Sequence, residues 1–178
     1  MTKRSLAVLL CGIDVLGGAL ALLLYGSAPK GGDIEKMQSA ARIPPTGFKE
    51  FRSDAYHFSL FYPDELLVGE REEVDGAHTF VFENASSTRG FQIFVVPYFE
   101  EAVSAERLKK DLPSGVIKEQ QEIVVGGDTK GMIFYSTNAL LGETREVWFI
   151  KNKFLYEVNT YKKLDVWLSQ IIGTLVFI

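Results

Sequence analysis

Hydrophobic and polar residues alternate along most of the chain that follows Phe48. Residues 56–62 read Tyr-His-Phe-Ser-Leu-Phe-Tyr, with the period of two that a strand with one buried face shows. Similar stretches recur between clusters of Asn, Asp, Gly and Ser, which are typical of turns. The further predicted strands are residues 66–70, 77–83, 91–96, 117–125, 130–137, 143–150 and 154–158. We expect the first four strands to form an antiparallel meander.

Two stretches at helical spacing interrupt and end this series of strands. Ser104 can cap a short helix that runs to Leu112, and Pro113 closes it. A second helix begins at Asp165. Its predicted apolar face consists of Leu164, Leu168, Ile171 and Ile172. The pattern therefore predicts an α+β domain, an antiparallel sheet with helices packed on it, whose last residues, 175–178, dock on the core.

The beginning of the chain has a different pattern, with almost no charge from Ser5 to Tyr25. About 20 apolar residues cross the ~30 Å hydrocarbon layer as a helix, so this segment is predicted to span a lipid bilayer. Lys3 and Arg4 precede it, and basic flanks tend to stay on the cytoplasmic side. We therefore expect a single-pass membrane protein with a cytoplasmic amino terminus and an extracytoplasmic domain.

This predicted transmembrane anchor is either retained or removed as a signal peptide. Gly26-Ser27-Ala28 offers small residues for cleavage, but Pro29 would follow the cut, and the apolar stretch is longer than a usual signal core. Retention as an uncleaved signal-anchor is the favoured interpretation. The predicted organisation is an anchor over residues 1–27, a flexible linker rich in Pro and Gly over 28–47, and a domain over 48–178.

Charge and cysteine content narrow the range of partners. With Lys3, Arg4 and Asp14 set aside from the 19 basic and 23 acidic residues, 17 and 22 remain, a net charge of −5 beyond the anchor. A nucleic acid requires a basic surface, so we expect no nucleic-acid partner. Cys11 is the single cysteine and lies in the anchor, so the domain must be stabilised by packing without an internal disulfide.

No motif for catalysis or for binding a cofactor or metal occurs, so we predict no catalytic, cofactor-binding or metal-ligating residue. His57 and His78 are the two histidines, and they lie in different predicted strands without ligand spacing. Neither a Gly-x-Ser-x-Gly sequence nor a phosphate-binding glycine loop is present. The acidic run at residues 70–75 is either a solvated turn or a source of carboxylates that meet others in space.

Aromatic residues at the ends of predicted elements are the candidates for partner contacts. Most aromatic side chains of a sheet covered by helices belong to the core. Tyr98, Tyr161 and Trp167 differ, because each lies where an element begins or ends and its ring can stay partly in contact with water. We expect these three side chains to contact an unidentified envelope protein or a small ligand.

Several stretches of the chain resemble a known fold family. They are Tyr56-His57-Phe58-Ser59-Leu60-Phe61-Tyr62-Pro63, Gly126-Gly127-Asp128-Thr129-Lys130-Gly131, Trp148-Phe149-Ile150 with Phe154-Leu155-Tyr156, and the end Ile171-Ile172-Gly173-Thr174-Leu175-Val176-Phe177-Ile178. In these stretches and in the order of its elements, the chain resembles the PsbP-like fold that photosystem extrinsic proteins share with Mog1-like Ran-binding proteins. It departs from that pattern at His57, where a small residue is usual, and at Glu65, where a tryptophan is frequent. The resemblance implies a three-layer α-β-α sandwich whose members dock on partners and usually have no enzymatic activity.

Two hypotheses for the function follow. The favoured one is a membrane-tethered, non-catalytic interaction module that docks on an envelope protein or a small ligand. The alternative is an extracytoplasmic hydrolase that uses carboxylates from residues 70–75 and from other segments. The module predicts acidic side chains spread over solvent, whereas the hydrolase predicts that several converge in one concave pocket.

The retained anchor can be tested by mass. We expect the protein extracted from membranes to have the intact mass of a chain that still contains Ser5 to Tyr25, because the apolar segment is long enough to stay in the bilayer. Intact-mass spectrometry measures this directly. A mass that corresponds to a chain beginning at Pro29 would contradict retention.

Overall fold

The computed structural model describes residues 42–112 and 114–178, and residues 43–178 form one compact unit. The predicted anchor and most of the predicted linker lie outside the described residues. In the part of the chain that is described, no helix is long and apolar enough to cross a membrane. The strands are β1 (Phe48–Ser53), β2 (Phe58–Pro63), β3 (Leu67–Glu72), β4 (His78–Glu83), β5 (Gly90–Pro97), β6 (Lys118–Val125), β7 (Thr129–Asn138), β8 (Gly142–Lys151), β9 (Phe154–Tyr161) and β10 (Val176–Phe177). The helices are η1 (Val74–Gly76), α2 (Ala105–Asp111), η2 (Lys162–Leu164) and α3 (Asp165–Ile172).

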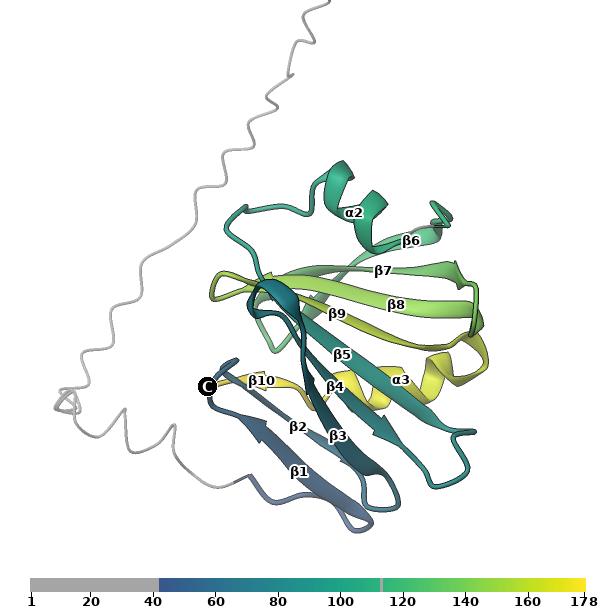
Figure 1. The fold of residues 1–178 in the computed structure, drawn as a ribbon. Coiled ribbons are helices and arrows are strands. Elements are labelled where there is room, and N and C mark those ends of the chain that lie inside the picture. The colour runs from purple at the N-terminus through teal and green to yellow at the C-terminus, as the bar shows by residue number, and fades with distance from the viewer. Residues whose placement is uncertain (1–41, 113) are drawn as a thin grey trace, which may run out of the picture. The chain divides into compact units, whose positions relative to one another are not determined.

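The strands form two antiparallel sheets (Figure 1). A seven-stranded sheet has the order β3-β4-β5-β9-β8-β7-β6, and a three-stranded sheet has the order β1-β2-β10. The expected meander is correct for β3, β4 and β5, which pair in chain order, but wrong for the first predicted strand, because β2 pairs with β1 and β10 and not with β3. Every residue of β2 is buried, so this strand needs a neighbour at both edges. β1 has only scattered apolar residues, and its sequence does not show the period of two that the other strands have.

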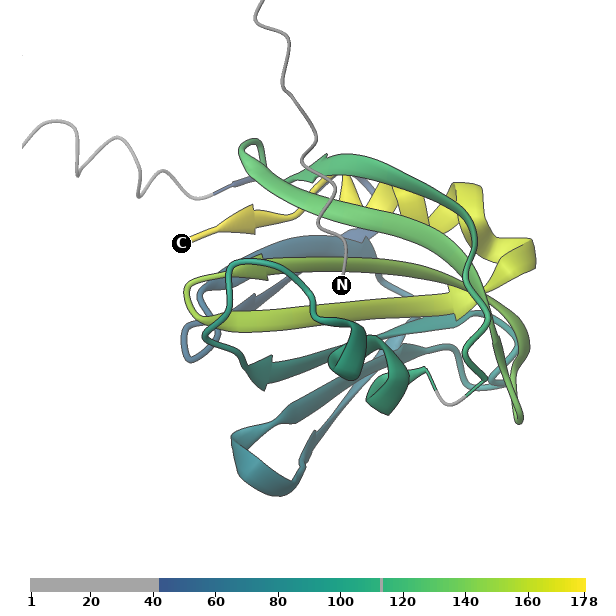
Figure 2. The same ribbon diagram turned by 90° about the horizontal axis from the view of Figure 1, so that it is seen from above.

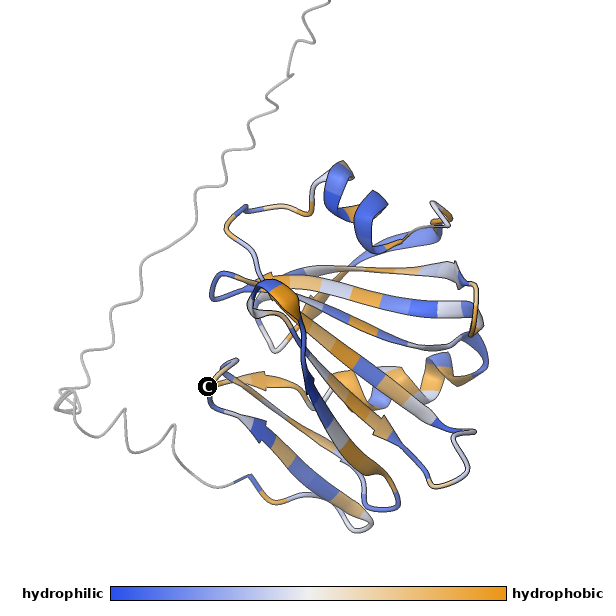
Figure 3. Ribbon diagram, in the orientation of Figure 1, coloured by the Kyte–Doolittle hydropathy of each residue, from blue (hydrophilic) through white to orange (hydrophobic). Residues whose placement is uncertain are grey.

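The main core lies between the three-stranded sheet and one face of the seven-stranded sheet, which we call the inner face. Strands β4, β5, β8 and β9 alternate along their length, and every second side chain points to this face. These buried side chains are Phe80, Phe82, Phe91, Ile93, Val147, Phe149, Tyr156 and Val158. Phe82 and Phe91 stack with ring centroids 4.4 Å apart. Hydrophobic colour gathers on the facing strands β4 and β10, whereas α2 is mostly hydrophilic (Figure 3).

α3 covers the rest of the inner face. The predicted apolar positions Leu168, Ile171 and Ile172 are buried in the same core, which confirms the terminal helix. Its first residue, Asp165, forms an ion pair of 2.9 Å between its Oδ1 and Arg145 Nε, and its Oδ2 accepts a 2.8 Å hydrogen bond from the Tyr135 hydroxyl. A carboxylate in the first turn also interacts favourably with the helix dipole. These contacts fix the start of α3 against strands β7 and β8.

α2 packs on the opposite face of the seven-stranded sheet, which we call the outer face (Figure 2). Ser104 caps this helix as predicted, since its Oγ accepts a hydrogen bond from the backbone N–H of Arg107. Leu112 is packed with Phe134 and Trp148 of the sheet. Helices thus lie on both faces of the large sheet, as expected. The expectation of a single sheet is wrong, because a second, three-stranded sheet lies in the same layer as α3.

The carboxyl-terminal tail docks as predicted, and two tight turns close the hairpins β8–β9 and β6–β7. Asn152 and Lys153 both have positive φ and close the β8–β9 hairpin, which matches the twist of the strands it joins. Leu175 is buried and β10 pairs with β2, so the tail docks on the core. Gly126, between β6 and β7, has φ +61° and its missing Cβ would lie 2.5 Å from a ring atom of Phe177.

Because Phe177 lies so close to Gly126, replacing Gly126 or its neighbour Gly127 by alanine should destabilise the protein by different amounts. Gly126→Ala should lower the free energy of unfolding by about 2–3 kcal/mol, because backbone strain adds to a clash with the Phe177 ring. Gly127→Ala should cost about 1 kcal/mol, since φ is +92° but no atom lies within 4 Å of the added Cβ. Urea unfolding of the purified full chain measures both values. Equal losses would show that the ring of Phe177 does not constrain Gly126.

Candidate functional site

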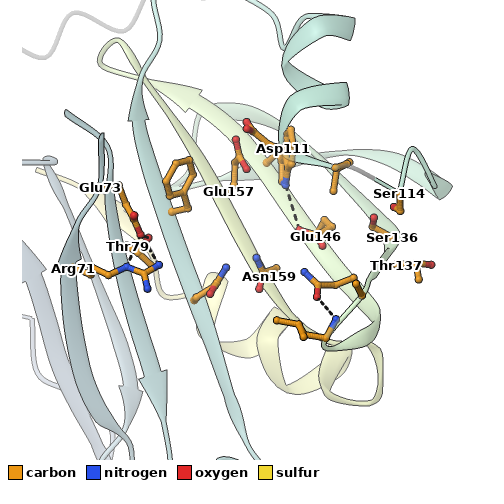
Figure 4. Close-up of a pocket in the computed structure, with 17 residues that line it drawn as sticks. Arg71, Glu73, Thr79, Asp111, Ser114, Ser136, Thr137, Glu146, Glu157 and Asn159 are labelled. Atoms are coloured by element: carbon orange, nitrogen blue, oxygen red, sulfur yellow. Dashed lines mark hydrogen bonds and ion pairs between the residues drawn. The ribbon is translucent and has the colours of Figure 1, made fainter. Parts of the chain in front are cut away.

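A groove of about 840 Å³ opens on the part of the outer face that α2 leaves uncovered (Figure 4). Its volume is in the range typical of ligand sites. The side chains that line it come from β3 and the residue after it, from β4, β5, β7, β8 and β9, from the β7–β8 hairpin loop, and from the end of α2 and the loop after it. They are Arg71, Glu73, Thr79, Gln92, Phe94, Asp111, Leu112, Ser114, Ser136, Thr137, Asn138, Ala139, Leu140, Glu146, Trp148, Glu157 and Asn159.

Strand register explains why these residues share one face. Residues directly opposite each other in an antiparallel pair point to the same side of the sheet. Glu157 of β9 lies opposite Phe94 of β5 and opposite Trp148 of β8. Glu146 lies opposite Asn159 in the same pair of strands, two residues further along β8 and β9. The two glutamates are therefore diagonal neighbours at the floor of the groove.

Glu157 belongs to a buried cluster at the α2 side of the groove. Arg107 forms an ion pair with Asp111 one helical turn later, and its Nη2 lies 3.4 Å from Glu157 Oε1. Glu157 is only 6% exposed. Burial, followed by hydrogen bonding to Asp111 and the negative charge of Asp111, raises the pKa of Glu157 to about 9. These surroundings therefore favour the uncharged form of Glu157, which lies between an acid and a guanidinium group.

Glu146 has different surroundings. It is 5% exposed, its Oε1 accepts a 2.6 Å hydrogen bond from the Thr144 hydroxyl, and its Oε2 accepts a 3.4 Å hydrogen bond from the Trp148 indole N–H. Burial raises the pKa of this carboxyl group, and the two hydrogen bonds oppose that rise in part. No lysine or arginine forms an ion pair with Glu146 in the described parts of the chain, residues 42–112 and 114–178.

Ser136 lies on β7 directly opposite Thr144, next to Glu146 in the groove (Figure 4). Its side chain is 3% exposed, and within the described residues its Oγ makes no hydrogen bond. A buried hydroxyl without a partner is costly and is uncommon in folded proteins. Leu140, at the tip of the β7–β8 hairpin, forms the rim and is 94% exposed.

The acidic run at residues 70–75 sends one side chain into the groove. Glu73 accepts a 2.8 Å hydrogen bond from Thr79 and pairs with Arg71. The hydrogen bonds from Thr79 and Arg71 lower the pKa of Glu73. The other acids of this run, Glu70, Glu72 and Asp75, are exposed. No group of three or more His, Cys, Asp or Glu suited to a metal occurs in the described sequence.

The three aromatic candidates lie apart from this groove. Tyr98 is 7% exposed, and its hydroxyl donates to the Ala102 carbonyl and accepts from the backbone N–H of Ser104. The expectation that its ring is partly exposed is wrong, because these bonds hold it under the loop before α2. Tyr161 and Trp167 are half-buried as expected, and the guanidinium carbon of Arg89 lies 4.8 Å from the Trp167 ring centroid. Their contact with a partner stays a prediction.

Sequence reasoning did not single out Glu146, Glu157 or Asp111. Glu157 stands alone in the apolar stretch Phe-Leu-Tyr-Glu-Val, whereas Glu146 ends the polar run Glu-Thr-Arg-Glu. An isolated carboxylate in a strongly apolar strand is the signal that could have identified Glu157, because charged groups are almost never fully buried without a purpose or a partner. Nothing in the local sequence of Asp111 indicates that α2 carries it to the same groove.

Comparisons with known proteins identify the fold. No family model and no curated protein matches the chain. Among solved structures, the chain is similar to the solution structure of cyanobacterial PsbP, CyanoP, from Synechocystis sp. PCC 6803, with a TM-score of 0.55 and 6% sequence identity. The match covers 79% of this chain and 98% of that chain. The chain therefore has a PsbP-like fold, as the sequence motifs indicated, and at this identity the likeness concerns the fold alone.

The raised pKa of Glu157 predicts how stability depends on pH. Between its ordinary value of 4.5 and about 9, the folded chain holds a proton on Glu157 that the unfolded chain has lost. The contribution of Glu157 to stability should therefore fall as pH rises through this window. Glu157→Gln cannot titrate, so its unfolding free energy should fall less steeply between pH 5 and 8 than that of the unsubstituted chain. Urea unfolding at several pH values measures the difference in slope.

Asn159→Ala is the matched control, because it lies on the same strand face and carries no titrating group. It should keep the slope of the unsubstituted chain. Parallel slopes for Glu157→Gln and the unsubstituted chain would contradict the protonated state of Glu157.

Proposed function

We propose that this chain is a non-catalytic interaction module that docks on an envelope protein or a small ligand through the groove on the outer face. The observation that carries the proposal is the groove itself, a concave space of about 840 Å³ on the outer face of the sheet. Ligand sites are typically concave, with apolar walls and a few polar groups that fix orientation. Phe94 and Trp148 provide apolar surface, and Gln92 and Asn159 provide amide groups between them.

The rim adds a second argument for docking. Leu140 projects from a hairpin whose backbone is fixed, because Asn138 Oδ1 accepts hydrogen bonds from the N–H groups of Leu140 and Leu141. An apolar side chain that is 94% exposed at the edge of a polar groove is a plausible anchor for a partner. Tyr161 and Trp167, near the carboxyl-terminal end of β9, are further candidate contacts.

The predicted transmembrane anchor is part of the same proposal. The apolar segment from Ser5 to Tyr25, with Lys3 and Arg4 before it, supports a single-pass anchor with the domain on the extracytoplasmic side. A partner in the same envelope would then be met at a high effective concentration. The likeness of fold to a photosystem extrinsic protein is in keeping with this proposal.

A hydrolase is the second candidate, and one observation favours it. Glu73, Asp111, Glu146 and Glu157 come from four segments and converge on one cavity, which is what the hydrolase hypothesis required. Each of these acids is held by internal contacts, however, and no histidine, cysteine or lysine is among the described residues that line the groove. Ser136 Oγ makes no hydrogen bond to a base within the described residues, so it is not an activated nucleophile. We therefore favour the binding module.

The groove can be tested by crosslinking in native membranes. A photo-crosslinking residue at Leu140 should capture a reproducible partner, whereas the same residue at Val166, which is also apolar and exposed and lies on α3, should not. Gln92→Trp places an indole inside the groove and should abolish the Leu140 crosslink. Mass spectrometry of the crosslinked species measures both results.

Two outcomes would contradict the proposal. Equal capture at Leu140 and Val166 would show that contact is unspecific, and a crosslink that survives Gln92→Trp would place the partner outside the groove. Turnover of a glycoside or ester substrate by the full chain, lost in both Glu146→Gln and Glu157→Gln, would favour the hydrolase instead.

A further inference from the structure

The charges that line the groove do not balance. Its acids are Glu73, Asp111, Glu146 and Glu157, of which Glu157 favours its uncharged form, and its cation among the described residues is Arg71. Arg71 is engaged by Glu73, and the nearby Arg107 is engaged by Asp111 and Glu157. Glu146 is the acid of the groove that has only neutral hydrogen-bond donors, Thr144 and Trp148. A buried carboxylate needs a cation or several donors to offset its lost hydration.

Ser136 gives an independent observation at the same place. Its Oγ is buried against the groove and makes no hydrogen bond within the described chain, although a hydroxyl can donate once and accept twice. Ser136 and Glu146 are diagonal neighbours on β7 and β8, with Thr144 opposite Ser136. An N–H donor placed between them would reach a carboxylate oxygen and a hydroxyl oxygen together.

We propose that the groove binds an alkylammonium or guanidinium group of its ligand, with the Glu146 carboxylate and the Ser136 hydroxyl accepting its N–H donors. This inference rests on the proposed function, since it names the chemistry of the ligand for the same groove. Phe94 and Trp148 line the groove beside these acceptors and provide a surface for the aliphatic stem. An anion is disfavoured there, because Arg71, the cation among the described residues of the groove, is already paired with Glu73.

The raised pKa of Glu146 supports this choice. Burial penalises the charged carboxylate in the empty groove, and a bound cation would remove that penalty by direct pairing. Such a group could come from a lysine or arginine of a partner or from a free amine. The chemistry is shared, so the experiment must separate the two sources.

The test uses the purified full chain in a nonionic detergent and calorimetric titration. The probes are n-butylguanidinium, n-butylammonium and the neutral n-butylurea, which has nearly the shape of the first. We expect both cations to bind about tenfold or more tightly than n-butylurea, because only they pair with Glu146. Glu146→Gln should weaken cation binding about tenfold, and Ser136→Ala about threefold to tenfold. Neither substitution should change the binding of n-butylurea as strongly.

Glu143→Gln is the matched control, because Glu143 lies on the same strand but outside the groove. It should leave the affinity of n-butylguanidinium unchanged. Circular dichroism checks that each variant is folded. If Glu146→Gln does not fold, Ser136→Ala and competition by n-butylguanidinium against the Leu140 crosslink decide the question.

Spermidine and the peptide acetyl-Gly-Arg-Gly-amide separate the two sources of the cationic group. Tighter binding of the peptide indicates a protein partner, and tighter binding of spermidine indicates a free amine.

The outcomes separate this inference from the proposed function. Equal binding of n-butylurea and n-butylguanidinium, or an affinity that Glu146→Gln leaves unchanged, would overturn the cation site. If the Leu140 crosslink nevertheless forms and Gln92→Trp abolishes it, the groove is a docking site that does not require a cationic group. If neither probe nor crosslink reports on the groove, both proposals fail.

Discussion

The structure depends on the unequal covering of the two faces of the seven-stranded sheet. A sheet that is apolar on one face must bury that face against another layer. Here the three-stranded sheet and α3 complete this layer, with Phe58 of β2 packing its ring against Phe80 and Tyr156 of the large sheet. α2 is only two turns long and covers a smaller part of the outer face. The remainder of that face is free to carry polar side chains.

Alternation along the strands makes this division possible. In β8 the side chains of Val147 and Phe149 enter the core, while those of Glu146 and Trp148 lie on the outer face. The same strand therefore stabilises the fold and provides part of the floor of the groove. A site built on paired strands is held more rigidly than one built on loops, which suits recognition by fixed hydrogen-bond acceptors.

Burying the carboxyl groups of Glu146 and Glu157 in the groove costs folding free energy. Desolvation raises the pKa of both Glu146 and Glu157, which means that the fold disfavours their charged forms. For Glu157 the contact with Arg107 offsets part of this cost, whereas the contact with Asp111 adds to it. Glu146 has only Thr144 and Trp148. Buried titratable groups that cost folding free energy are frequent at functional sites, where a bound ligand provides the interactions that the folded chain lacks.

The sequence by itself determined most of the elements and the class of fold. Strand periodicity, the Ser104 cap and the Asn152-Lys153 turn are local properties, because each depends on residues a few positions apart. The motifs at residues 56–63 and 171–178 indicated the PsbP-like fold for the same reason. Only the tertiary structure decided that β2 leaves the large sheet, since pairing depends on which distant strand, here β1 or β10, satisfies its edges. The tertiary structure alone also decided which residues form the groove. Its acids, Glu73, Asp111, Glu146 and Glu157, lie far apart in the chain and come together only through strand register and the position of α2.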